Sequence, residues 1–210
     1  MIKADEARAW ALAQVGCPYL MGGTGKPCTP AYRSARAAQY PASAEKIRAA
    51  CPRAGKKAVS CAGCRYYDAS AKRGKPAYDC AQLTRFCMAA VGISLVSGAT
   101  SQWKKTAWAR QGEISALPRD RLCLVYRRDS AGKMGHAGIY LGDGTVVHAK
   151  GHAWGVVREK LNEGNRFTHY GIPEGLDAPE ENAVAGLLHD LRTALDRLEA
   201  ALEERAHAAG

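Results

Sequence analysis

The order of the elements predicted between residues 78 and 175 constrains the fold of this 210-residue chain more than any other feature. A helix is expected over 78–93, where Asp79 has the side chain of an N-terminal cap, and a second helix over 100–110. Short strands are then expected at 122–127, 137–141, 146–149, 156–161 and 169–172. Helices followed by closely spaced strands indicate an α+β domain with an antiparallel sheet, because parallel strands need a long crossover between them.

The remaining segments differ in composition. Residues 1–15 are predicted to form an amphipathic helix, whereas 26–77 are rich in Ala, Lys, Arg and Pro and contain few large apolar side chains. Such a segment buries little surface by itself and needs a cross-link, such as a bound metal ion or a disulfide, to be stable. We therefore expect one domain over 1–175, with 26–77 as a Cys-rich basic insertion, followed by a linker over 176–182 and an amphipathic helix over 183–207.

Charge is distributed unevenly along the chain. Residues 176–210 carry three Arg against eight acids, and residues 1–175 carry 27 Lys and Arg against 12 acids. A basic body favours a polyanionic partner, such as an anionic wall polymer, a membrane surface or nucleic acid. No nucleic-acid recognition motif accompanies this charge and no apolar run approaches bilayer-spanning length, so we expect neither specific nucleic-acid binding nor a membrane span.

The C-terminal segment has a heptad pattern. Apolar residues recur at alternating steps of four and three, at Val184, Leu188, Leu191, Leu195, Leu198 and Leu202. This is the a/d seam of a coiled coil. The helix either packs on its own domain or pairs with a second copy or a partner, and the acidic, Pro-containing linker before it favours pairing.

A cysteine at a predicted helix start and two histidines on later strands form the central chemical pattern. The free N–H groups and the dipole of a helix N-terminus stabilise a thiolate at Cys80, and the thiolate is the nucleophilic form. His136 is the best candidate for its base, and His148, on the following strand, for the residue that orients the base. The alternative for a helix cysteine is a small buried apolar side chain, which we assign to Cys87 and to Cys123 on a strand.

The turn between the two histidine strands tests this interpretation. If the turn has two residues, His148 pairs with Ile139 and faces away from His136. If residues 142–144 form a three-residue loop, His148 pairs instead with Gly138. The two histidines then lie diagonally on one face with Cβ atoms about 7 Å apart. A catalytic pair therefore requires the longer loop.

Four motifs, in this order and spacing, resemble those of the NlpC-like cell-wall cysteine peptidases. They are PYLMGGT at 18–24, YDCAQL at 78–83, GHAGIYLGDG at 135–144 and TVVHA at 145–149. The resemblance covers most of residues 5–173 and implies a circularly permuted papain-like fold. It also implies cleavage of peptidoglycan stem peptides through an acyl-enzyme, with no cofactor for catalysis.

The resemblance also implies a role for each matched residue. Cys80 is the nucleophile, His136 the general base and His148 the residue that orients it. Tyr19 corresponds to a residue that serves the oxyanion site or the substrate, and Asp79 to one that meets a substrate amine.

Two departures from the family pattern leave the scissile bond open. Ala-Gln at 81–82 replaces the usual Ser-Gly after the nucleophile, and Pro-Arg-Asp at 118–120 replaces Pro-Gly-Asp. The alternatives are an amidase or acyltransferase on the same Cys–His site, or a non-catalytic module that binds wall polymer or nucleic acid.

Four of the eight cysteines fall within the predicted insertion, at Cys28, Cys51, Cys61 and Cys64. Cys61 and Cys64 have the two-residue gap of a zinc knuckle. A structural zinc ion would supply the cross-link that this segment needs to be stable. Disulfides and plain free thiols are the alternatives, because the wider spacings match no standard zinc finger. The position of the segment just before Cys80 predicts that it borders the substrate groove.

The first residues carry acids at Asp5 and Glu6 and no long apolar run, so no signal peptide is predicted. We therefore expect synthesis in the cytoplasm and action on the cell wall after lysis, phage delivery or non-classical export. A phage endolysin, a virion-associated lysin or a secreted toxin would fit this expectation.

Overall fold

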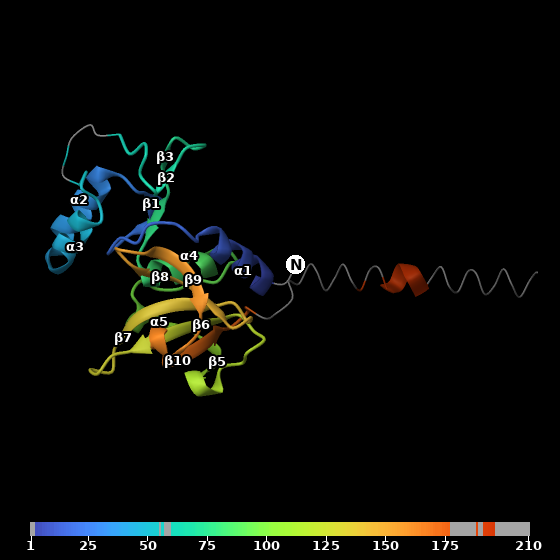
Figure 1. The fold of residues 1–210 in the computed structure, drawn as a ribbon. Helices are drawn as coiled ribbons and strands as arrows, with labels where there is room; N and C mark the ends of the chain where they lie inside the picture. Colours follow the sequence, from blue (N-terminus) through green and yellow to red (C-terminus); the bar gives the residue numbers. More distant parts are fainter. Residues whose placement is uncertain (1–2, 55, 57–59, 177–187, 189–190, 196–210) are drawn as a thin grey trace, which may run out of the picture.

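A six-stranded antiparallel sheet forms the centre of the computed structural model, which describes residues 3–54, 56, 60–176, 188 and 191–195. Its strands follow the order β5-β10-β6-β7-β8-β9. They are β5 (Trp108–Glu113), β6 (Cys123–Arg128), β7 (Met134–Tyr140), β8 (Thr145–Gly151), β9 (Gly155–Lys160) and β10 (His169–Pro173). Three helices accompany the sheet, α1 (Lys3–Ala13), α4 (Cys80–Ala89) and α5 (Ala99–Lys105). Helix α4 packs on β7 and β8, and α5 packs on β7, so the predicted α+β architecture is confirmed (Figure 1).

One predicted element is wrong in part. The helix expected over 100–110 ends at Lys105, and Trp108 begins β5, which pairs with β10. The Trp108 indole contacts Trp103 and lies over Gly171, where a Cβ would come within 2.6 Å of the ring. Because β5 is an edge strand with mostly exposed side chains, its sequence lacks the alternation that identifies a strand.

Helix α4 begins where the sequence predicts, although it is shorter than the expected 78–93. The Asp79 carboxylate accepts a hydrogen bond from the backbone N–H of Gln82 at 2.8 Å and so caps the helix. This cap makes Cys80 the first helical residue. Cys87, two turns later, and Cys123 on β6 are fully buried, as expected for small apolar side chains.

The hairpin of β7 and β8 has the register that a catalytic pair requires. Ile139 pairs with Val147, which leaves residues 142–144 as a three-residue loop. The same register puts His148 opposite Gly138, where a Cβ would lie 3.1 Å from the His148 Cβ. The prediction of the longer loop is confirmed, and the two candidate histidines share a face of the sheet.

The segment predicted as an insertion forms a lobe beside the sheet (Figure 1). Its elements are β1 (Thr24–Pro27), α2 (Pro30–Gln39), a 3-10 turn (Pro41–Ser43), α3 (Ala44–Ala49), β2 (Tyr67–Asp68), β3 (Arg73–Gly74) and β4 (Pro76–Tyr78). Strand β1 pairs with β4, and β2 with β3. Neither α2 nor α3 was expected, although the Thr29 side chain caps α2 and Pro30 is its first residue. The buried cluster of the lobe is small, as expected, and consists of Leu20, Cys28, Ala37, Ala44, Ile47 and Ala77.

Most of the predicted C-terminal helix over 183–207 lies outside the described residues. Residue 188 and residues 191–195 are helical, and Leu188, Leu191 and Leu195 are exposed there. The other three heptad positions and the linker residues 177–182 are outside the described part, so the pairing of this helix stays a prediction. Within the described ranges, no helix has the length and apolar character needed to cross a membrane.

Candidate active site

A cavity of about 780 Å³ opens where the start of α4, strand β7, helix α3 and the β8–β9 turn meet. Four of the five predicted site residues line it, namely Tyr19, Asp79, Cys80 and His136. The fifth, His148, lies behind His136 and contacts its ring. Residues 43, 46, 49 and 50 of the lobe also line the cavity, so the prediction that this segment borders the groove is confirmed.

The Cys80 thiol faces backbone donors from two elements, α4 and β7. The N–H groups of Ala137 and Ala81 lie near its sulfur and favour the thiolate. Burial and the Asp79 carboxylate outweigh them and raise the pKa of the Cys80 thiol to about 11. The free protein therefore holds Cys80 as a neutral thiol near neutral pH, whereas the helix position alone predicts a thiolate.

The base is also neutral in the free protein. Burial, followed by the charges of His148 and Arg127, lowers the pKa of His136 to about 3. Within the described chain the Cys80 thiol and the His136 ring share no hydrogen bond. Contacts of this kind often tighten only when substrate binds. A neutral thiol and a neutral imidazole thus line the same cavity.

A chain of three side chains supports the base. His136 Nε2 lies 2.7 Å from His148 Nδ1, and His148 Nε2 lies 3.0 Å from the Oε1 atom of Glu159 on β9. Glu159 also accepts hydrogen bonds from Lys150 Nζ at 2.6 Å and Asn165 Nδ2 at 2.8 Å. Burial alone would raise the pKa of Glu159, but the donors Lys150, Asn165 and His148 lower it to about 2.

These hydrogen bonds determine which ring nitrogen of His136 is unprotonated. The ionised Glu159 carboxylate only accepts, so His148 Nε2 carries the proton of that ring. Burial lowers the pKa of His148, so its Nδ1 is unprotonated and accepts from His136 Nε2–H. His136 Nδ1 then keeps its lone pair, as a general base needs.

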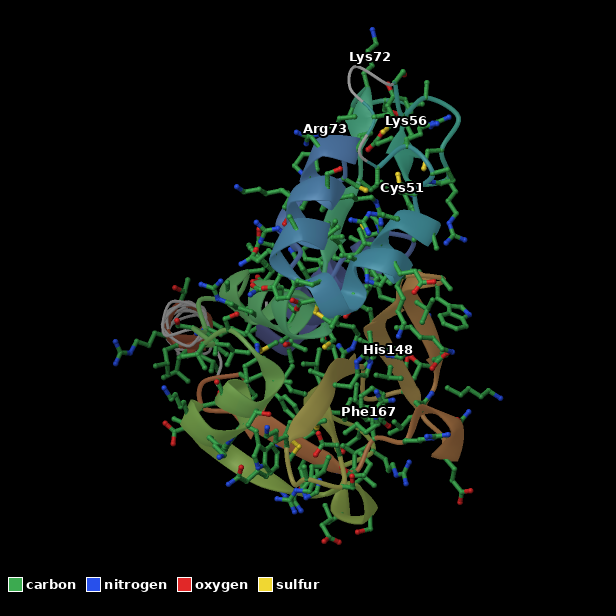
Figure 2. The ribbon with its side chains drawn as sticks, turned by 90° about the vertical axis from the view of Figure 1, so that its left-hand side faces the viewer. Cys51, Lys56, Lys72, Arg73, His148 and Phe167 are labelled. Carbon is green, nitrogen blue, oxygen red and sulfur yellow. The ribbon has the colours of Figure 1, made fainter. Side chains whose placement is uncertain are left out.

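Phe167 holds both rings in place. Its side chain stacks on His136 with 5.7 Å between ring centroids and meets His148 edge-on at 5.5 Å. Figure 2 shows His148 and Phe167 together in the part of the molecule that holds the sheet. Gly138 makes room for this packing, because a Cβ there would come within 3.0 Å of the Phe167 ring.

The cavity wall also contains His152, which the sequence indicates only as an ordinary loop residue. His152 lies in the β8–β9 turn and meets Tyr19 edge-on at 4.7 Å between ring centroids. Both of its ring nitrogens are buried and have no hydrogen-bond partner among the described residues. Lys46, Arg127 and Lys150 also line the cavity, and Asp79 is the one acid among its described lining residues. The cavity therefore suits a substrate that carries negative charge.

The two residues after Cys80 are placed differently. Ala81 lines the cavity, but Gln82 points away from it and donates to Ser97 Oγ at 2.8 Å. Of the two residues that replace the family's usual Ser-Gly, Ala81 is therefore the one that bears on substrate contact, because it lacks the serine hydroxyl.

Comparison with known proteins decides the family. The NlpC/P60 family model matches residues 64–170, just over half of the chain. This chain belongs to the NlpC/P60 family. No curated protein matches the chain.

Solved NlpC/P60 structures resemble the chain at low sequence identity. The P60 domain of antigen MAP1204 from Mycobacterium avium subspecies paratuberculosis is 16% identical, with 84% of this chain and 96% of that chain covered and a TM-score of 0.49. NlpC1 from Trichomonas vaginalis is 15% identical, with 82% and 44% covered and a TM-score of 0.48. The peptidoglycan hydrolase RipB from Mycobacterium tuberculosis is 18% identical, with 79% and 63% covered and a TM-score of 0.47. This chain thus spans well under two thirds of the NlpC1 chain and slightly under two thirds of the RipB chain.

Substitution of Glu159 tests the support of the base in this NlpC/P60 chain. Glu159→Gln keeps the shape of the side chain but can present an N–H to His148, which favours the wrong tautomer of both rings. We expect kcat for cleavage to fall about 10- to 100-fold, in line with other outer partners of catalytic histidines, with KM little changed. Steady-state kinetics on a soluble stem peptide would measure this. Glu163→Gln, an exposed neighbour, is the matched control, and equal effects of the two substitutions would exclude the proposed role.

Acid should destabilise the fold through the same residues. The pKa of His136 is about 3 in the folded chain against about 6.5 when unfolded, so the unfolded chain binds this proton first as pH falls. The contribution of His136 to the free energy of unfolding is complete above pH ~6.5 and is lost as pH falls toward 3. The contribution of Glu159 is lost at still lower pH, toward 2. Melting temperatures measured from pH 7 to 3 should fall more steeply for wild type than for His136→Asn. Parallel curves for the two proteins would contradict this assignment.

Proposed function

We propose that this chain is a cysteine hydrolase that cleaves peptidoglycan stem peptides through an acyl-enzyme. The observation that carries the proposal is the placement of Cys80, at the start of a helix, in one cavity with His136. The Nε2 atom of His136 bonds to His148, which in turn bonds to Glu159. Nucleophile, base and orienting group are the three parts that thiol catalysis needs.

The first step is proton transfer coupled to attack. His136 Nδ1 takes the proton of the Cys80 thiol while the sulfur forms a bond to the carbonyl carbon of the substrate amide. The carbonyl π electrons move to oxygen, and the backbone N–H of Cys80 and the Tyr19 hydroxyl are the donors for that oxyanion. Burial raises the pKa of Tyr19 well above its usual range, so its hydroxyl keeps the proton that it donates.

The second half of the reaction restores the enzyme. The carbon–nitrogen bond breaks as His136 passes its proton to the leaving amine, which leaves a thioester on Cys80. Water then attacks the thioester while His136 takes one of its protons. Collapse of this intermediate releases the carboxylic acid, and the proton returns to the Cys80 sulfur.

The charge of the cavity supports stem peptides as substrates. These peptides carry free carboxylates, and Lys46, Arg127 and Lys150 line the cavity. Asp79 is half-buried and lines the cavity, so its carboxylate, which caps α4, would meet a substrate amine there. RipB, one of the similar structures, is named a peptidoglycan hydrolase.

Digestion of purified peptidoglycan tests the proposal. Sacculi with different diamino acids are incubated with the protein, and soluble fragments are analysed by mass spectrometry. We expect stem-peptide fragments with new amino and carboxyl termini, and their masses identify the bond. Binding to sacculi without fragments would instead support a non-catalytic module. Transfer of the acyl group to an added amine, without hydrolysis, would support an acyltransferase.

A further inference from the structure

A second cavity, of about 330 Å³, contains the four cysteines of the lobe. Cys28 follows β1, Cys51 follows α3, and Cys61 and Cys64 form a turn closed by a hydrogen bond from the Cys64 N–H to the Cys61 carbonyl at 3.0 Å. All four are free thiols in the structure. Figure 2 shows Cys51 in the lobe, well away from His148, so this cavity is separate from the candidate active site. Cys28 and Cys51 are 23 positions apart in the sequence. In the fold they line one pocket together with Cys61 and Cys64.

A buried arginine indicates that this cavity holds negative charge. The Arg33 side chain is 1% exposed, and its Nε donates to the Cys28 sulfur at 3.1 Å. Its Nη1 is buried without a hydrogen-bond partner among the described residues. Arg53 also lines the cavity, and no Asp or Glu is among the lining residues that the structure describes. A buried guanidinium without an anion is costly, so the cysteine sulfurs are the groups available to balance it.

We propose that Cys28, Cys51, Cys61 and Cys64 bind one zinc ion as four thiolates, with Arg33 as their charge partner. Four thiolates around Zn²⁺ carry a net charge of about −2, which two arginines in the cavity wall offset. Two disulfides would be neutral and would leave the Arg33 guanidinium without an anion. The buried arginine therefore favours zinc over the disulfide alternative.

The sulfurs must move closer together when the metal binds. Within the described ranges, no three Cys, His, Asp or Glu side chains are already gathered tightly enough to hold an ion. Cys51, Cys61 and Cys64 are only half-buried and line the same cavity as Cys28, so the closure needs no movement of the buried core. Because the lobe has a small apolar core, metal binding would supply folding energy that burial does not.

The metal site also adjoins the wall of the active-site cavity. Ala50, at the end of α3, lines both cavities. Arg65, next to Cys64, donates through Nη2 to the Ala153 carbonyl at 2.6 Å, in the turn that carries His152. The zinc site would therefore connect α3, which carries Lys46, to the β8–β9 turn. The assignment itself stands independently of the proposed hydrolase activity.

Metal analysis of the full chain tests the site. Protein purified under reducing conditions with added zinc is expected to contain one zinc per chain. Cys61→Ser should reduce the zinc content at least twofold, whereas Cys80→Ala, which removes a thiol from the other cavity, should leave it at one. Cobalt exchanged for zinc should show the absorption of a tetrahedral site with thiolate-to-metal charge transfer. None of these readouts depends on catalysis.

Two further measurements guard against a variant that fails to fold. Removal of zinc from wild type by a chelator should lower the melting temperature, and added zinc should restore it. Intact mass under non-reducing conditions counts disulfides directly. Zinc-free protein with two disulfides among these cysteines would overturn the proposal. Full zinc content in the Cys61→Ser variant would overturn the ligand set.

Discussion

Replacement of Cys80 by alanine is expected to abolish cleavage of stem peptides, with a loss in kcat/KM of at least about 10⁴-fold. Without the sulfur no thioester forms, and a water molecule in its place lacks the positioning that the start of α4 provides. The rate of fragment release, measured by liquid chromatography and mass spectrometry, gives the effect.

Cys87→Ala is the matched control for this loss. Cys87 lies two turns later in the same helix, is fully buried, and donates through its thiol to the Ala7 carbonyl at 3.3 Å. Its removal should lower the melting temperature, because it leaves a small cavity and removes this hydrogen bond, but should leave kcat unchanged. A Cys80→Ala protein that retains more than a tenth of wild-type activity would exclude Cys80 as the nucleophile.

Replacement of His136 by alanine is expected to have the second-largest effect, a loss of about 10²- to 10⁴-fold in kcat. Its second signature is the pH profile. In wild type, the neutral thiol and neutral imidazole persist between pH ~4 and ~10, so the rate should change little across that range. In His136→Ala, the thiolate must form by loss of a proton to solvent. The residual rate should therefore rise about tenfold per pH unit until the pH approaches the Cys80 pKa of about 11.

His169→Ala provides the control for this substitution. His169 lies on β10 of the same sheet, contacts Trp103 at 5.2 Å between ring centroids, and does not line the active-site cavity. It should leave both the rate and the shape of the pH profile unchanged. A His136→Ala variant with a flat profile and near-normal rate would show that another group takes the proton.

Local signals were sufficient to predict the inner part of the site. Asp79 is a strong capping residue, and a cap fixes the position of the next residue, Cys80, at the helix start. Whether His136 and His148 lie on the same face of the sheet depends only on the length of one tight loop. The sequence allows two lengths for it, two or three residues. The structure then selected the case with residues 142–144 as the loop.

Glu159 was missed because a register shift hides it. Gly151 pairs with Gly155 at the β8–β9 turn, and counting from that pair would put His148 opposite Arg158. An irregularity between Ala149 and Gly151 shifts the pairing by one residue, so that His148 pairs with Val157 and Glu159 lies diagonally on the same face. Because no short motif marks this bulge, the sequence gives no sign of the shift.

The protonation states were missed for a different reason. A helix N-terminus favours a thiolate, but the sequence does not show how deeply Cys80 is buried. Burial is the largest effect on the pKa values of both Cys80 and His136, and it favours the neutral form of each. Burial depends on packing between α4 and β7, which only the folded structure reveals.

The most direct test of the account is detection of the acyl-enzyme. A soluble stem peptide is mixed with wild type, quenched in acid at short times, and analysed by intact-protein and peptide mass spectrometry. The account predicts an adduct with the mass of the acyl fragment on the peptide that contains Cys80, and neither adduct nor product with Cys80→Ala. Product formed by the Cys80→Ala protein at the wild-type rate, or an adduct located on another residue, would contradict it.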